Sequence, residues 1–579
     1  MARPTRRPPA QEPLLDWSPA EFDDDMLAAA LGRTALRAAH RTRARGYTAR
    51  VHRPTAQDPA PRVELPTCTV RFPVPRELGY ALTDAAAQLR GELITLAVWA
   101  FRAADAEQRT EVSVGGPATG GRTPTAAAGD ALDAAVALAD ELLLDGVQQA
   151  GPVFTGSLRH AGRALAATSR HWPAGAVADL QEQLDAYTAR ATRYTPERLA
   201  LLLAELHARH RAGGHDPVGV LGTAEAPVTP LRRVRLVALG CRIGGSAGDR
   251  TAETYFAHAD AGIALVLRTR WDLTQDQSPT GHDLSTRRLL GSPLHALATA
   301  NVVSEHTARA ADRTVTLSRG RIAATSITPV GSAWTELPGS LLLPDTAAHL
   351  RAAGERPPRL IRPRVAADAV RVIMVDAVDE IGYDPAAQRL EAVLRDPAGN
   401  DVHLHAEYNP LCPGGLDALA AALADDRIRA VSGMLGRCHG RTVLDPLAVL
   451  TAQGVTVPDL APGPGDTTLR TTARRPTDPI TAALRAALTT LADAAHQGLR
   501  HMTPATRTAL TDSAVRLRRT GLDRAARLLD DLARTLHDQG APAAAPHWVT
   551  AQIHLTTSLD LYQEDGWRVS PRGERLPRP

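Results

Sequence analysis

The sequence predicts an α+β protein of several domains, in which helical-hairpin modules flank a β-rich central region. Three observations lead to this fold class. The chain has 579 residues, too many for one hydrophobic core, so about three to five domains are expected. Two long stretches carry apolar residues on one helical face, and the stretch between them has the short apolar runs and turn residues of strands.

Shifts in composition divide the chain into seven segments. We predict a disordered N-terminus, an α/β segment, a helical-hairpin domain, a β-rich α+β domain, a linker, a C-terminal helical domain and a disordered tail. In that order, the bounds are 1–13, 14–110, 124–214, 229–460, 461–478, 479–565 and 566–579.

The α/β segment begins with a helix-start signal. Ser18-Pro19-Ala20-Glu21 supplies an N-cap, a proline at the first helical position and an acid in the first turn, so a helix is expected to follow. Asp23-Asp24-Asp25 falls in the first turn of that helix, where acids complement the helix dipole. Strand-like runs lie at 47–52 and 63–74, and a helix is expected over 84–105.

The helical modules follow from amphipathic periodicity. After the Gly-rich loop 115–121, which lacks the Lys-Ser/Thr of a phosphate-binding loop and is interpreted as a linker, apolar residues recur at helical spacing. The expected helices include 156–170, 174–191, 195–212 and the segment that begins at Asp478-Pro479, a good N-cap and first helical position.

The two modules share a leucine pattern. Leu158 and Leu165 are seven residues apart, as are Leu510 and Leu517, and the pair Leu180/Leu184 then corresponds to Leu528/Leu532. This pattern fits a duplicated module, and it equally fits two unrelated helical segments rich in Ala and Leu.

The central region shows β-type patterns. Strands are expected at 235–239, 263–267, 370–375, 390–394 and 402–407. A helix at about 415–424 and a hairpin over 428–449 complete the region.

Charge composition argues against a dedicated nucleic-acid binder. Arg supplies all of the 66 cationic residues, against 63 acidic ones, and the two signs are interspersed. A nucleic-acid binder usually shows a basic excess on one face. Because Ala is also abundant, we interpret the Arg content as GC-rich codon usage in a bacterial genome.

The sequence gives no sign of secretion or membrane insertion. The basic N-terminus is not followed by the apolar stretch of a signal peptide, and no apolar run approaches the about 20 residues that span a bilayer. The four cysteines, Cys68, Cys241, Cys412 and Cys438, are far apart and do not suggest a disulfide scaffold. We expect a cytoplasmic protein without a membrane partner.

One segment has a family resemblance. Residues 67–102, which run from Thr-Cys-Thr-Val-Arg-Phe-Pro into the apolar stretch Leu96-Ala97-Val98-Trp99-Ala100-Phe101, resemble the SWIM zinc-finger segment of bacterial proteins. That family has Cys-x-Cys followed by Cys-x-His and an apolar helix. The four ligands hold a structural zinc, and such segments are associated with DNA or protein binding.

The resemblance implies a degenerate member of that family. Aligning the apolar helices places Thr83, Ala85, Gly91 and Leu93 at the ligand positions, and none of these can bind zinc as the family does. Cys68 lies outside the register, and one thiolate cannot hold a structural zinc. Zinc is therefore expected only if the family interpretation holds despite the missing ligands.

Two patterns have the outline of a reactive site. Gly244-Gly245-Ser246-Ala247-Gly248 matches the Gly-x-Ser-x-Gly elbow of hydrolases, but a second strand is expected after it where an elbow needs a helix. His403 and His405 share one face of a strand with Glu407 and could hold a metal. A solvated sheet face explains this pair better, because two ligands are a weak signal.

The remaining candidates are interpreted as structural. His207 and His210 lie on a helix without the Glu and spacing of a zinc protease motif, so a solvated face is expected. Cys438 and His439 are adjacent and point to opposite faces of a hairpin, and Cys241 and Cys412 are expected to be inert. Arg232-Arg233 and Arg518-Arg519 could touch phosphates, but such pairs normally lie on solvated faces.

The sequence therefore predicts no catalytic, cofactor-binding or metal-binding residues. The preferred hypothesis is a non-enzymatic interaction or scaffold protein that binds a protein partner. The first alternative is a zinc-ion and nucleic-acid binding protein of SWIM type, or one that binds nucleic acid without zinc, in which case the folded surface must carry an Arg-rich face. The second alternative is a hydrolase with a noncontiguous site near Ser246.

Overall fold

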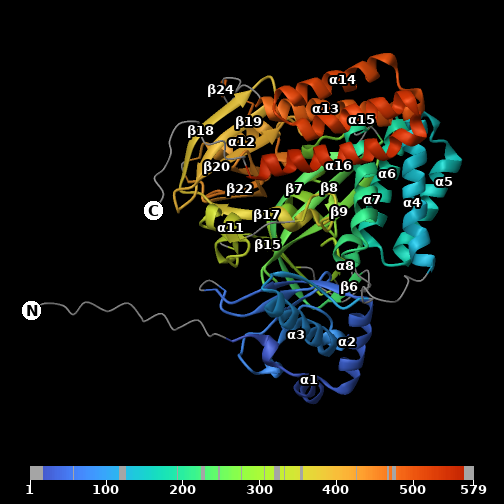
Figure 1. Ribbon diagram of the computed structural model, residues 1–579. Helices are drawn as coiled ribbons and strands as arrows, with labels where there is room; N and C mark the ends of the chain where they lie inside the picture. Colours follow the sequence, from blue (N-terminus) through green and yellow to red (C-terminus); the bar gives the residue numbers. More distant parts are fainter. Residues whose placement is uncertain are drawn as a thin grey trace, which may run out of the picture.

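The computed structural model confirms the predicted fold class, an α+β protein of several domains (Figure 1). An N-terminal unit lies at the bottom of Figure 1, helices gather at the upper right, and strands fill the middle and the left. No helix in the part of the chain that is described is long and apolar enough to cross a membrane. The structure describes residues 17–55, 58–116, 126–191, 194–222, 228–245, 248–274, 277–305, 307–317, 326–330, 333–352, 357–425, 427–465, 469–471 and 478–565. The predicted disordered ends, 1–13 and 566–579, lie outside these residues.

The N-terminal unit is an antiparallel sheet with strand order β4-β3-β2-β1-β5 and three helices. Helix α3 forms much of its core, because every residue from Leu93 to Phe101 is buried. The elements are α1 (Asp24–Leu31), α2 (Arg33–Arg45), β1 (Tyr47–His52), β2 (Arg62–Glu64), β3 (Thr69–Arg71), β4 (Leu82–Thr83), α3 (Arg90–Glu107) and β5 (Glu111–Val114).

Two sequence predictions for this unit need correction. The run expected at 63–74 is two strands, because the chain bends at Pro66 and Thr67 between β2 and β3. The helix expected from residue 84 begins at Arg90, after a loop and a short 3-10 turn.

The helices of the two predicted modules pack on one hydrophobic core. Helix α13 contacts α7, and α16 contacts both. Trp548 of α16 is fully buried, and its Nε1 donates a hydrogen bond to the Leu491 carbonyl of α13 at 2.9 Å. The helices are α4 (Ala126–Asp145), α5 (Pro152–Ala167), α6 (His171–Thr188), α7 (Pro196–Ala212), α8 (Pro217–Leu221), α13 (Pro479–Gln497), α14 (Pro504–Arg519), α15 (Asp523–Asp538) and α16 (Ala541–Asp565).

The first part of the β-rich region holds two larger sheets, with orders β15-β12-β7-β8-β9 and β14-β13-β6, and a short pair, β10-β11. Its elements are β6 (Val228–Leu231), β7 (Val234–Gly245), β8 (Asp249–His258), β9 (Ile263–Asp272), α9 (Gly281–Ser285), β10 (Arg288–Leu289), β11 (Ser292–Pro293), α10 (Leu294–Ala298), β12 (Ala300–Ser304), β13 (Thr307–Ala310), β14 (Val315–Leu317) and β15 (Ser326–Pro329).

The second part of the β-rich region is a sheet that returns on itself. Its order is β16-β17-β21-β22-β20-β19-β18-β24, with β23 paired to β22. Only two residues separate β17 from β18 in the chain, so the sheet must curve to bring these strands near each other, although no hydrogen-bonded pairing joins them among the described residues. We call this curved sheet the barrel; within it, β20 runs parallel to β22. The elements are β16 (Leu342–Leu343), α11 (Thr346–Ala352), β17 (Val370–Met374), β18 (Ala377–Asp384), β19 (Arg389–Arg395), β20 (Asp401–Glu407), α12 (Gly415–Leu423), β21 (Ala430–Cys438), β22 (Arg441–Thr451), β23 (Gly454–Thr456) and β24 (Arg470–Thr471).

Candidate functional site on helix α2

The four positions aligned with zinc ligands lie in the N-terminal unit, and their roles there are structural. Thr83 ends the edge strand β4, and Leu93 is buried in the core. Gly91 allows α3 to approach the preceding helices, because a Cβ atom there would lie 2.8 Å from the Ala35 side chain of α2. Among the described residues, no group of three or more His, Cys, Asp or Glu side chains could hold a metal ion.

The histidine pairs differ in their surroundings. His403 and His405 lie on one face of β20, as predicted, opposite Val393 and Glu391 of β19. A solvated helix face was expected for both His207 and His210, and this expectation is wrong for His207. His207 is buried where α7 packs on α4.

The α7 histidines face carboxylates of α4. The Nε2 atom of His207 lies 3.2 Å from an Asp140 carboxylate oxygen, and that of His210 lies 2.8 Å from Asp133. These contacts explain the two histidines as helix-packing residues.

The serine and cysteine candidates do not fit the expectations for a reactive site. Ser246 lies outside the described residues, but Gly245 pairs with Arg250 across the β7–β8 hairpin, so a strand follows where an elbow needs a helix. Cys241 and Cys412 are buried, and burial raises the pKa of both thiols, which disfavours the reactive thiolate.

Cys438 and His439 lie at the turn between β21 and β22. The turn packs against the end of α16, where the His439 backbone N–H donates to the Gln563 carbonyl at 2.7 Å and the imidazole meets the Tyr562 ring edge-on. The contact holds this end of the barrel against the last helix.

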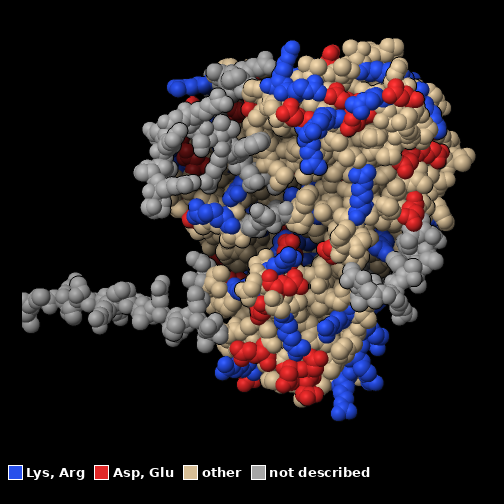
Figure 2. Space-filling view, in the orientation of Figure 1, with Lys and Arg blue, Asp and Glu red and all other residues tan. Residues whose placement is uncertain are grey.

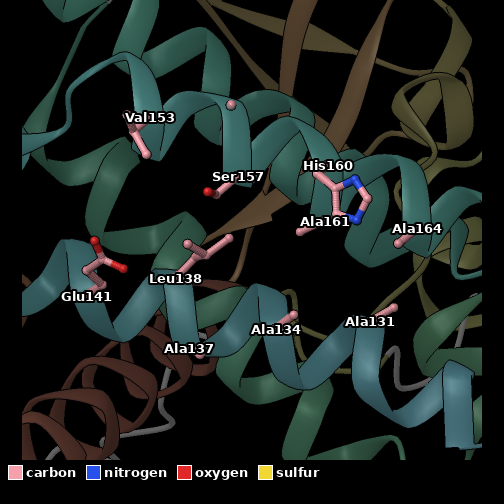
Figure 3. Close-up of a pocket in the computed structure, with 11 residues that line it drawn as sticks. Ala131, Ala134, Ala137, Leu138, Glu141, Val153, Ser157, His160, Ala161 and Ala164 are labelled. Atoms are coloured by element: carbon pink, nitrogen blue, oxygen red, sulfur yellow. The ribbon is translucent and has the colours of Figure 1, made fainter.

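An open groove runs between α4 and α5 (Figure 3). Most of its lining is small or apolar, and its polar side chains are Glu141, Ser157 and His160. Figure 3 shows Glu141 and His160 toward opposite ends of the groove, with Ser157 between them. The three groups therefore do not converge as a nucleophile, a base and an orienting acid would.

Helix α2 carries a stripe of arginines. Arg33, Arg37, Arg41 and Arg45 recur at every fourth residue, so they share one face of the helix, and all four are exposed. The helix contains no acidic residue, and within the described residues none of the four forms an ion pair. Figure 2 shows cationic side chains at the lower right of the molecule, where α2 lies in Figure 1. We call these four residues the α2 arginine stripe.

The opposite side of α2 fixes the helix on α3. Ala39 and Thr42 are buried, and the Thr42 hydroxyl donates to Glu92 of α3 at 2.7 Å. The buried Trp99 ring of α3 is covered by the Arg43 guanidinium, 5.1 Å from the ring centroid, and by the His40 ring at 4.8 Å. The arginine stripe is thus displayed by a helix with a defined position.

The sequence contained the signal for this stripe. Arg recurs at every fourth position, at 33, 37, 41 and 45, and no acidic residue lies between them. This spacing places like charges on one face of a helix. Charge balance and codon usage, judged over the whole chain, concealed this local excess.

A second charged group lies at the junction of the N-terminal unit and the β-rich region. It consists of Glu64, Asp84, His258, Arg309 and Arg313, whose side chains are at most 10% exposed, and we call it the junction cluster. Arg313 bonds to Glu64 through Nε at 2.8 Å, and Arg309 Nη2 lies 3.2 Å from the same carboxylate oxygen. Strand β2 of the first unit is thereby tied to β13 and to the turn between β13 and β14.

Burial and nearby charge shift the junction cluster pKa values in different directions. Burial raises the pKa of Asp84 to about 6, although Arg309 opposes the shift. Burial also disfavours the charged Glu64, but Arg313 and Arg309 outweigh it and lower the pKa to about 2. Burial, with help from Arg309, lowers the pKa of His258 to about 3. The cluster is enclosed, so its chemistry is that of a structural junction.

Comparison with known proteins overturns the SWIM resemblance. Residues 127–235 match the family model of the YehQ four-helical bundle domain, and residues 367–479 match that of the YehQ C-terminal OB-fold domain. The first match covers helices α4 to α8 and strand β6, and the second covers the barrel and its neighbours from β17 to β24. The interpretation of residues 67–102 as a degenerate SWIM zinc finger is therefore wrong. An apolar helix behind two short strands produced the likeness without the ligands that define the family.

No solved structure matches the chain. Protein YehQ of Escherichia coli (strain K12) is 27% identical over 468 residues, which cover 75% of this chain and 74% of that protein. By sequence, the chain is similar to YehQ over most of its length.

Proposed function

We propose that this protein binds nucleic acid without zinc and without catalysing a reaction, through the α2 arginine stripe. The observation that carries the proposal is that Arg33, Arg37, Arg41 and Arg45 lie exposed on one face of a helix that has no acid. Guanidinium groups bind phosphate oxygens through paired hydrogen bonds. A row of them therefore suits a polymer with regularly spaced phosphates.

The alternatives have weaker support. A hydrolase elbow needs a helix after its serine, and a strand follows residues 244–248 instead. In the α4–α5 groove, Ser157 and His160 do not converge with an orienting acid. Binding of a protein partner, the hypothesis preferred from sequence, stays a prediction, because the apolar groove carries nothing that identifies an occupant.

The proposal predicts a strong dependence of affinity on salt. Each neutralised phosphate releases counterions, so the logarithm of affinity falls with the logarithm of salt by about 0.9 for each contact on a duplex. If all four arginines of the stripe bind phosphates, they account for a slope of about 3 to 4.

The test compares two fourfold Arg→Gln variants of equal net charge. The first carries R33Q, R37Q, R41Q and R45Q. The control carries R507Q, R519Q, R524Q and R527Q, which change exposed arginines on α14 and α15. Fluorescence anisotropy with labelled nucleic acid over a salt series gives the affinity and slope of each.

We expect the α2 variant to lose at least about tenfold in affinity and most of the salt slope, and the control to bind as the unchanged protein does. Equal losses in both variants would show that affinity follows net charge alone, which contradicts the proposal. Absence of binding at low salt, or binding to anionic lipid vesicles alone, would also reject it.

A further inference from the structure

We propose that α2 binds double-stranded DNA by entering its major groove, with Arg37 facing the base edges. This inference rests on the proposed function and specifies the form of nucleic acid. It follows from the shape of the exposed face of α2, the way the helix is supported and the side chains that the face lacks.

The exposed residues of α2 form one continuous face. Successive residues of an α-helix are rotated by about 100°, which places Arg37 near the middle of this face and Thr34, Arg45 and His40 toward its edges. The exposed positions on the face are Arg33, Thr34, Arg37, His40, Arg41, Ala44 and Arg45, and Arg43, also exposed, lies beyond His40 and covers Trp99.

The helix has the dimensions of a groove-binding element. Its 13 residues extend over about 20 Å at 1.5 Å each, and a helix with its side chains is about 10–12 Å wide. The major groove of DNA is about 12 Å wide and admits one α-helix. Figure 1 shows α2 on the outer side of the N-terminal unit, at the lower right, where a duplex could approach.

The support of α2 keeps this face exposed. Gly32, with a φ of 91°, turns the chain between α1 and α2 in a conformation that favours glycine. Behind the helix, Ala35 packs against Gly91, and at its edge Arg43 and His40 cover Trp99; these contacts hold the helix against α3. A rigid helix presents base-reading side chains without a large ordering cost on binding.

Other nucleic acids fit this face less well. Proteins that bind single strands stack bases on exposed aromatic rings, and the exposed face of α2 has none except the His40 imidazole, which already packs against Trp99 at a tilt. Trp99 itself is buried beneath Arg43. Duplex RNA has a deep, narrow major groove that side chains cannot read.

The position of each arginine predicts its role. Arg37, in the middle of the face, is placed to reach base edges, where arginine favours the O6 and N7 acceptors of guanine. Arg45, at the edge of the face, is placed to contact a phosphate. A base contact carries sequence preference, whereas a phosphate contact contributes affinity for any sequence.

The test uses one mixed sequence in four labelled forms: duplex DNA, single-stranded DNA, duplex RNA, and duplex DNA in which 7-deazaguanine replaces guanine. The replacement removes the N7 acceptor of the major groove and leaves every phosphate in place. The unchanged protein, R37A and R45A are compared by anisotropy at one salt concentration. Both substitutions are at exposed positions, so the fold should be retained.

We expect the unchanged protein to bind duplex DNA at least about tenfold more tightly than the single strand or the RNA. It should also bind the 7-deazaguanine duplex several-fold more weakly. R37A should remove the difference between guanine and 7-deazaguanine, whereas R45A should weaken binding to both by the same factor.

Equal affinity for all four forms would overturn groove binding and leave the proposed function standing. Loss of the 7-deazaguanine effect in R45A and not in R37A would overturn the assignment of Arg37. Failure to bind any of the four would reject the proposed function itself.

Discussion

At the scale of single residues, the carboxylates of the junction cluster show how position decides the charge of a buried acid. Glu64 faces two guanidinium groups, whereas Asp84 is 3.9 Å from the nearer nitrogen of Arg309. The Asp84 Oδ2 atom and the His258 Nδ1 atom lie 3.7 Å apart, and neither has a hydrogen-bond partner among the described residues. Ionised Asp84 is therefore poorly compensated for its loss of water.

The raised pKa of Asp84 predicts a dependence of stability on pH. A carboxyl whose pKa is about 6 when folded, against about 3.9 when unfolded, stabilises the fold below pH 4 and loses that contribution as the pH rises through 6. Asp84→Asn removes the titration. Relative to Asp84→Asn, the unchanged protein should therefore lose up to about 3 kcal/mol of unfolding free energy between about pH 4 and pH 7. Urea denaturation across this range measures the difference.

Glu64→Gln is a control in which the pH dependence of stability has the opposite direction, because the pKa of Glu64 is lowered where that of Asp84 is raised. The lowered pKa of Glu64 means that its charge stabilises the fold above its unfolded pKa, and that this contribution is lost as the pH falls toward 2. This variant should be destabilised near neutral pH. Parallel pH profiles for the unchanged protein and Asp84→Asn would contradict the assignment to Asp84.

At the scale of elements, two turns remote in sequence hold the helical bundle together. Gly146 ends α4 and Gly498 ends α13, with φ of 80° and 85°. A Cβ atom at Gly146 would strike the backbone of Gln497, and one at Gly498 would strike that of Asp145. The two turns pack backbone against backbone, which only glycine allows.

Alanine at either glycine should destabilise the bundle. The positive φ alone costs about 1–2 kcal/mol, and the steric overlap adds to it. The control is Gly521→Ala, because Gly521 has a φ of 81° and no atom within 4 Å of an added Cβ. Thermal unfolding should show a larger loss for Gly146→Ala and Gly498→Ala than for the control; equal losses would show that the contact between the turns is unimportant.

Sequence patterns predicted most elements of this bundle and of the barrel. The strands expected at 390–394 and 402–407 and the helix at 415–424 are present as β19, β20 and α12. The boundaries failed where a local loop interrupts an apolar run, as at Pro66 and before Arg90. Periodicity reports which residues are buried, and it is insensitive to a short bend between two buried segments.

The leucine pattern shared by the two helical modules has a structural counterpart. Both α5 and α14 begin with a proline, and each ends in the same turn. After α5, the Arg170 backbone N–H donates to the Leu165 carbonyl at 2.8 Å. After α14, the Leu522 backbone N–H donates to the Leu517 carbonyl at 2.9 Å, at the same spacing of five residues. This agreement extends the pattern of Leu158/Leu165 and Leu510/Leu517 to the hairpin turn.

At the scale of the whole molecule, the fold class was predictable and the assembly was not. Amphipathic patterns identified helices on either side of a β-rich region, but they could not show that α7 packs on α13 or that α4 to α7 share a core with α13 to α16. An apolar helix face shows that another element must pack on it, but it does not identify that element. The α2 arginine stripe was missed for a related reason, because whole-chain charge averages over faces that point in different directions.

The position of the N-terminal unit depends on the junction cluster. Arg309 is fully buried on β13 and reaches across the junction to the Leu65 carbonyl at 3.4 Å and the Thr69 hydroxyl at 3.3 Å, besides Glu64. A second contact starts from the N-terminal unit: the Arg62 guanidinium of β2 donates to the Ala261 carbonyl of the β-rich region at 2.8 Å. Removing Arg309 should leave Glu64 and Asp84 as under-compensated buried acids.

Arg309→Met is therefore expected to loosen the N-terminal unit from the rest of the chain. Removal of one member of a buried charge network costs about 3–5 kcal/mol, because its partners stay buried without compensation. In hydrogen exchange measured by mass spectrometry, peptides from β2 and β3 should exchange faster, while peptides from α13 and α16 should be unchanged. The control is Arg268→Met, whose half-exposed guanidinium pairs with Glu253 and should cost no more than about 1 kcal/mol. Because α2 rests on α3 within the same unit, DNA affinity should survive Arg309→Met. Faster exchange throughout α4 to α16 would instead show that Arg309 supports the whole fold and not this junction.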